Sequence, residues 1–246
     1  AQSWIALEAI QSFEITDRGI CCYCTGSLLS VAFLSENLIR VRLAPTGELF
    51  PRRSWAVTQD DREFAPVAFE LEETAEAIIL RSSQVMVRVD RNPCQIACVD
   101  SEGRPFAQDC DLGMAWSASG VSAWKQIEPD EHFYGFGERT GLLDQRSEIK
   151  TNWTTDALDF NPLTDEMYQA IPFFIALRPQ LSYGIFLNSS FWSQFDLGAS
   201  KPGVWQMRTQ GPELDYYIIY GPEPAQILQT YTKLTGRIPL PPKWAL

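Results

Sequence analysis

Acidic and aromatic side chains are interleaved in one polar, turn-rich segment, residues 139–166. The acids are Asp144, Asp156, Asp159 and Asp165, and the aromatic residues in and just after the segment are Trp153, Phe160 and Tyr168. Aromatic rings stack on the apolar face of a neutral sugar, while carboxylates accept hydrogen bonds from its hydroxyl groups. The composition fits a saccharide-binding loop, and it fits equally a solvated loop with local packing.

Nucleophilic and phosphate-binding chemistry have weaker support. The one histidine, His132, lies in an acidic turn, and there is no G-x-S-x-G motif, so a catalytic triad would rest on that residue alone. We interpret His132 as a solvated turn residue. Gly135 and Gly137 lack the third glycine and the helix pattern of a dinucleotide-binding loop. They predict a strand that another backbone approaches closely.

The cysteines also argue against a metal site. They form two groups, which are Cys21, Cys22 and Cys24, then Cys94, Cys98 and Cys110. Neither group has the paired C-x₂-C spacing of a zinc site. We expect buried thiols on strands in a reducing compartment, and we predict no metal and no cofactor.

Charge restricts the partners. Against 31 Asp and Glu stand 20 Lys and Arg, a formal net charge of −11, and the basic residues occur at most in pairs. A field of this sign repels nucleic-acid phosphates and anionic lipid surfaces. The longest apolar run, residues 171–177, falls far short of the roughly 20 residues of a membrane helix. We therefore expect no nucleic-acid partner, no membrane span and a cytoplasmic location.

Short apolar segments separated by turn residues dominate the rest of the chain. We predict strands at residues 28–34, 38–43, 67–71, 77–80, 85–89, 183–188, 191–195, 204–209 and 214–220. In residues 85–89 the valines alternate with Met86 and Arg88, as in a sheet with one buried face. Turns about every 8–12 residues, without long helical patterns, predict a mainly β fold, an antiparallel β-sandwich.

One helix is predicted, at residues 224–234. Its apolar stripe consists of Ile227, Leu228, Tyr231 and Leu234. Pro224 suits the first turn, and Gly236 suits the position just past the end. The prolines that follow indicate an extended connector, after which Trp244 begins an apolar, strand-like end. We accordingly divide the chain into a sandwich domain, residues 1–221, and a helix with a proline-rich connector, residues 222–246.

Several segments together resemble a known family. They are HFYGFGERTGLLD at 132–144, NWTTD at 152–156, YQAIPFF at 168–174, YGIFLN at 183–188, ELDYY at 213–217, YTKLTG at 231–236 and PPKWAL at 241–246. Their order and spacing resemble glycoside hydrolase family 31, the α-glucosidases and α-xylosidases. The likeness covers residues 130–246, whereas residues 1–129 are similar only in pattern, as strands of the family's mutarotase-like sandwich. Ser147 departs from the family pattern, because it stands where a glycine is expected.

The resemblance implies a retaining glycosidase whose two catalytic aspartates belong to a (β/α)₈ barrel. This chain stops where the first barrel strand is expected, so we expect an N-terminal fragment that is inactive alone. Only Asp156 takes an active-site role by resemblance, as a contact to substrate hydroxyls, with Trp153 and Tyr168 lining the pocket. The implied partners are the chain's own C-terminal barrel and saccharides of α-linked glucose or xylose.

Two other functions remain open. The chain could be a free-standing carbohydrate-binding module, although an end at the start of a strand argues against a finished domain. A mutarotase is the third candidate, but that chemistry needs a paired acid and base, which a single histidine supplies poorly. The barrel interpretation further predicts an exposed apolar face near the helix, Trp244 and the loop at Trp153. The tail from Ile238 is expected to be mobile, or else borrowed by a neighbouring molecule.

Overall fold

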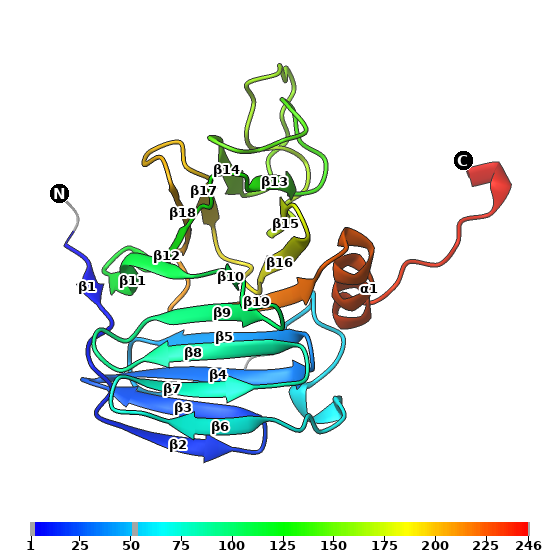
Figure 1. Ribbon diagram of the computed structural model, residues 1–246. Helices are drawn as coiled ribbons and strands as arrows, with labels where there is room; N and C mark the ends of the chain where they lie inside the picture. Colours follow the sequence, from blue (N-terminus) through cyan, green and yellow to red (C-terminus); the bar gives the residue numbers. More distant parts are fainter. Residues whose placement is uncertain (1–2, 51–53, 246) are drawn as a thin grey trace.

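Three antiparallel sheets account for most of the computed structural model, which describes residues 3–50 and 54–245 (Figure 1). The largest has, in spatial order, β13 (His132–Gly135), β15 (Phe173–Arg178), β16 (Leu181–Leu187), β19 (Leu214–Gly221), β5 (Leu38–Ala44), β4 (Ser27–Ser35), β3 (Gly19–Cys24) and β2 (Ser12–Thr16). The second has β1 (Ile5–Ala6), β11 (Asp109–Ser117), β12 (Gly120–Gln126), β18 (Val204–Thr209), β17 (Ser193–Asp196) and β14 (Ile149–Asn152). The third has β10 (Pro105–Phe106), β9 (Ile96–Asp100), β8 (Val85–Asp90), β7 (Ala77–Arg81) and β6 (Glu70–Glu73).

The eight-stranded sheet is covered on both faces, which explains why its central strands are mostly apolar. Every residue of β16 and β19 is buried. Along β19, Tyr216 and Ile218 belong to the main core shared with the other two sheets. Tyr217 and Ile219 belong to a second core cluster. Because successive side chains of a strand point to opposite faces, the two clusters lie on the two sides of the sheet.

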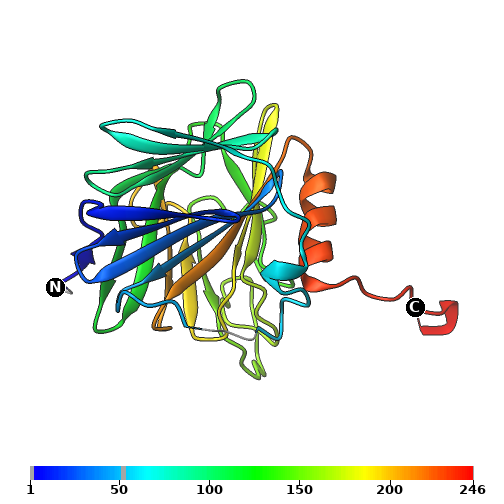
Figure 2. The same ribbon diagram turned by 90° about the horizontal axis from the view of Figure 1, so that it is seen from below.

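The second cluster is covered by α1 (Pro224–Thr235), which packs on β15, β16 and β19 (Figure 2). Ile227 is buried, and the ring of Tyr231 stacks on Phe173 with centroids 3.8 Å apart. Gly184 in β16 permits the close approach, because an added Cβ would lie 2.6 Å from Ile227.

No helix in the described part of the chain has the length and hydropathy of a membrane span.

The predicted mainly β sandwich with one C-terminal helix is confirmed. The 139–166 segment is more ordered than predicted, because β14 lies within it as a sheet edge with β17 as its partner. The end of the chain also differs. Lys243–Ala245 forms a 3₁₀ turn, η2, rather than the start of a strand, and its backbone is bonded locally, Ala245 N–H to Pro242 carbonyl at 2.9 Å. A strand needs a neighbour, and none lies beside these residues in the described chain. The boundary at residues 221–222 stays a prediction.

The thiols follow the expectation in most positions. All six cysteines are free, and four are buried, while Cys21 and Cys110 are half-buried. Cys94 is buried just before β9 rather than on a strand. Within residues 3–50 and 54–245, no three His, Cys, Asp or Glu side chains are grouped to hold a metal ion.

Candidate functional site

The polar segment identified in the sequence begins where β13 ends. Gly135 has φ of 145°, and an added Cβ would lie 2.6 Å from the carbonyl oxygen of Phe173 in β15. The predicted close backbone approach is therefore confirmed. Phe136 follows with φ of 67°; its N–H donates to the same carbonyl at 2.8 Å, and its buried ring stacks on Phe174. These two contacts of Phe136 fix the direction in which the chain leaves the sheet after β13.

Arg139 joins the two ends of an excursion that we call the 153–164 loop, near the top of Figure 1. Its Nη2 donates to the carbonyl oxygen of Thr151 at 2.8 Å and to Oδ1 of Asn152 at 3.2 Å, before the loop. Its Nη1 donates to the carbonyl oxygen of Asp165, after the loop. The Asp165 carboxylate accepts the Thr151 N–H at 2.7 Å. Burial lowers the pKa of Arg139, against the opposing charges of Asp165 and Glu166.

Asp144 orients the start of β13 rather than facing a ligand. Its Oδ2 lies 2.6 Å from Nδ1 of His132, and its Oδ1 accepts the N–H groups of Phe133 and Arg146. Partial burial acts to raise the pKa of Asp144, but these hydrogen bonds lower it overall. His132 is exposed, as predicted, but it is the first residue of β13 rather than a turn residue, and it pairs with a carboxylate.

The three residues assigned to substrate binding lie on the 153–164 loop or just after it. Asp156 is exposed, and its carboxylate has no hydrogen bond or ion pair with any other residue that the structure describes. Trp153 and Tyr168 are each 50% exposed. The Tyr168 hydroxyl donates to the carbonyl of Ala157, and its ring meets Phe160 edge to face at 6.5 Å. The fold thus brings Tyr168 into contact with Ala157, the residue after Asp156. The role of these residues in binding stays a prediction.

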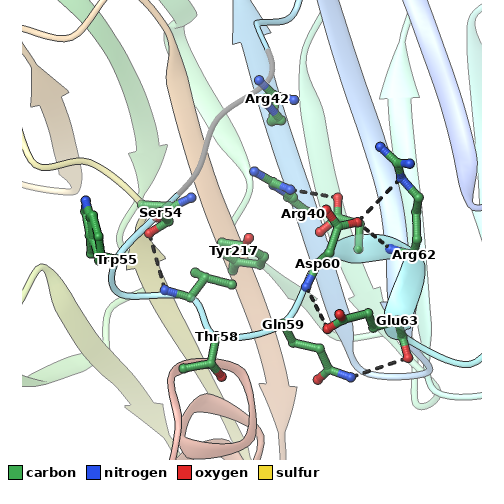
Figure 3. Close-up of a pocket in the computed structure, with 13 residues that line it drawn as sticks. Arg40, Arg42, Ser54, Trp55, Thr58, Gln59, Asp60, Arg62, Glu63 and Tyr217 are labelled. Atoms are coloured by element: carbon green, nitrogen blue, oxygen red, sulfur yellow. Dashed lines mark hydrogen bonds and ion pairs between the residues drawn. The ribbon is translucent and has the colours of Figure 1, made fainter.

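A second polar site, which the sequence did not predict, lies on the α1 side of the large sheet (Figure 3). It is a cavity of about 650 Å³ between β5, β19 and residues 54–63. Arg40 donates from Nε and Nη2 to both carboxylate oxygens of Asp215, at 2.9 and 2.8 Å, and from Nη1 to Asp61 at 2.7 Å. Asn188 donates to the same Asp215 carboxylate at 2.8 Å.

The charges of this cavity mainly bind one another. Asp215 is fully buried, and its charge and hydrogen bonds raise the pKa of Arg40 although burial alone would lower it. Because these groups already have partners, they hold residues 54–63 on the sheet more than they offer bonds to a ligand. One sequence feature could have predicted this site. Arg40 and Arg42 alternate in an otherwise apolar strand, and the acids Glu213 and Asp215 lie at the start of a second one.

An apolar hollow of about 500 Å³ adjoins this cavity and shares Trp55 and Asn188 with it. Trp55 is 86% exposed. Further exposed apolar side chains lie in the hollow (Phe191), on the 153–164 loop (Leu158, Phe160 and Leu163), on α1 (Leu228) and along the tail (Ile238, Leu240 and Trp244). The expected exposure of apolar residues around the loop, helix and tail is therefore confirmed, and such surfaces mark interaction sites.

Comparison with known proteins identifies the domain. The family model described as the glycosyl hydrolase 31 N-terminal galactose mutarotase-like domain matches residues 28–196, from the second residue of β4 to the end of β17, and so includes the whole 153–164 loop. The chain belongs to this family. The resemblance found in the sequence is thereby confirmed, and it extends over strands of the first half that had matched only in pattern.

Relatives of this family-31 domain are much longer than the chain. Alpha-glucosidase 2 of Bacillus thermoamyloliquefaciens is 34% identical over 96% of the chain, which spans only 30% of that relative. An isomaltosyltransferase of Sporosarcina globispora is 26% identical over 90% of the chain and 20% of its own length. Among solved structures, a family-31 dextranase of Flavobacterium johnsoniae complexed with glucose has a TM-score of 0.91 at 23% identity, covering 98% of this chain and 30% of that one. This last likeness establishes the fold.

Proposed function

We propose that this chain is the N-terminal accessory domain of a retaining α-glycosidase that hydrolyses α-glucosidic or α-xylosidic bonds. The observation that carries the proposal is the match, over 96% of the chain, to 30% of an α-glucosidase. A retaining mechanism needs a carboxylate nucleophile and a carboxylic acid roughly 5–5.5 Å apart. A (β/α)₈ barrel, outside the 246 residues, supplies both groups in this proposal.

The domain's own contribution is the 153–164 loop. The Asp156 carboxylate is exposed and has no partner among the residues that the structure describes, so its oxygen atoms can accept hydrogen bonds from sugar hydroxyls. Half of the surface of Trp153 and of Tyr168 remains open to stack on a sugar or to line its pocket. In this proposal the loop reaches over the barrel mouth and supplies a wall of the substrate pocket.

The barrel partner is supported by the apolar surface. Trp55 and Phe191 line an open hollow, and Leu158 and Leu163 are largely exposed on the loop. Covering these side chains removes apolar area from water, which stabilises association by about 25 cal/mol per Å². A catalytic barrel that follows the proline-rich connector is the partner we propose for this surface.

Activity assays on two polypeptides test the proposal. The 246-residue chain should release nothing above a buffer control from nitrophenyl α-glucoside or α-xyloside, whereas the longer enzyme should turn over one of them. Turnover by the short chain that is lost on mutating one of its own residues would overturn the accessory role. Binding of an α-linked disaccharide to the short chain alone, abolished by Trp153→Ala, would favour the free-standing binding module.

A further inference from the structure

One buried guanidinium holds the base of the 153–164 loop. We infer that Arg139 is a positioning residue, which fixes where this loop lies and thereby sets the place of the Asp156 carboxylate. What the loop touches rests on the proposed function above. How the loop is held depends only on contacts within this chain.

The contacts of Arg139 span three parts of the backbone. Nε donates to the carbonyl oxygen of Phe136, the residue just after β13, at 3.3 Å. Nη2 donates to Thr151 at the end of β14, and Nη1 donates to Asp165 after the loop. The side chain is only 2% exposed, so water cannot replace these donors easily. A single rigid plane therefore links the strand end, the entry of the loop and its exit.

Lysine cannot do the same work. Its ammonium is one donor point, whereas the guanidinium donates from three nitrogen atoms in a fixed fork. With lysine at this position, at least one of the carbonyl oxygens of Thr151 and Asp165 would lose its charged donor. The loss is aggravated because Asp165 also accepts the Thr151 N–H at 2.7 Å and lies 3.7 Å from the guanidinium. Disturbing one contact thus disturbs the whole base.

The rest of the loop provides little to hold it in place. Most of its residues are exposed, including Asp156 and Leu163. The bonds that tie its two sides together are few, among them the Thr155 N–H to the Met167 carbonyl at 2.9 Å and the Tyr168 hydroxyl to Ala157. Segments with few buried apolar contacts open readily, so the position of this loop depends on its base.

Hydrogen exchange on the 246-residue chain tests the clamp itself. In Arg139→Lys, amide exchange within residues 153–164 should accelerate roughly tenfold or more, the change expected from losing a charge-assisted hydrogen bond. Arg146→Lys is the matched control, because Arg146 also donates to backbone carbonyls, those of Glu128, Pro129 and Glu131, away from the loop. Unchanged loop exchange in Arg139→Lys, or equal acceleration in Arg146→Lys, would overturn the inference.

A double-mutant cycle in the longer enzyme tests the route of the effect. Arg139→Lys should lower kcat/KM roughly tenfold alone and by little more when added to Asp156→Ala, because it acts through that carboxylate. Additive losses in the two variants would refute a positioning role and indicate general destabilisation. If Asp156→Ala alone leaves kcat/KM unchanged, the proposed substrate contact fails, while the exchange experiment still decides the clamp.

Discussion

Glu131 makes the stability of this domain depend on pH. Glu131 lies just before β13 and is only 1% exposed. Burial raises the pKa of Glu131 from 4.5 to about 7, against the opposing effects of Tyr183, the Glu128 N–H and Arg178. The Glu128 N–H donates to the Glu131 carboxylate at 3.3 Å. One long hydrogen bond does not replace the water that an ionised carboxylate loses on burial.

The sign follows from proton binding. Between pH 4.5 and about 7 the folded protein holds a proton on Glu131 that the unfolded chain has released. The free energy of unfolding therefore falls as pH rises through this window, and it levels off above it. Each pKa unit corresponds to about 1.4 kcal/mol, so the total loss is about 3 kcal/mol. That is a large fraction of the roughly 5–15 kcal/mol stability of a typical domain.

Glu131→Gln removes the titrating group while keeping a polar side chain of similar shape. We expect the variant to gain about 3 kcal/mol relative to the native chain between pH 4.5 and pH 8. The measurement is urea unfolding of both chains at half-unit pH steps, followed by tryptophan fluorescence. Asp130→Asn, which changes an exposed acid of the same turn, serves as the control.

The refuting result is a constant difference between the two curves. If the native chain and Glu131→Gln lose stability in parallel from pH 5 to pH 8, Glu131 does not hold a proton in the folded state. A gain of the same size in Asp130→Asn would assign the effect to the net charge of the turn instead.

Three further predictions concern other residues. In the longer enzyme, Asp156→Ala should lower kcat/KM by roughly 10- to 150-fold with an unchanged Tm, and Asp156→Asn should lose less; a lower Tm with normal kinetics would indicate a turn-stabilising role. Ser147 has φ of 66°, so Ser147→Gly should relieve backbone strain and raise the free energy of unfolding by up to about 1 kcal/mol, measured by urea unfolding. Lys125→Met should lower the free energy of unfolding by about 3–5 kcal/mol in the same assay, because it leaves the buried Asp109 carboxylate, 2.6 Å from Lys125 Nζ, without its counter-charge. A smaller loss would mean that water enters the site.

Local sequence patterns were sufficient for much of the fold. The alternating valines of residues 85–89 predicted β8, and the stripe from Ile227 to Leu234 predicted α1 to within one residue. The run around Gly135 and Gly137 predicted a close backbone approach and, with later segments, the family. Such patterns are readable because a strand or helix with one buried face repeats its apolar residues at a fixed short period. β14 escaped notice because four residues at a sheet edge are too few to show a period.

Only the tertiary structure determined which role each of these acidic residues has. Asp144, Asp156 and Asp165 look alike in the sequence. In the structure Asp144 pairs with His132 and Asp165 closes the loop base, while Asp156 has no partner within residues 3–50 and 54–245. Arg40 likewise meets Asp215 across 175 residues. The physical reason is that the role of a charged side chain depends on which groups lie near it in space. Those neighbours depend on strand order and on how the long connections close, which no local spacing records.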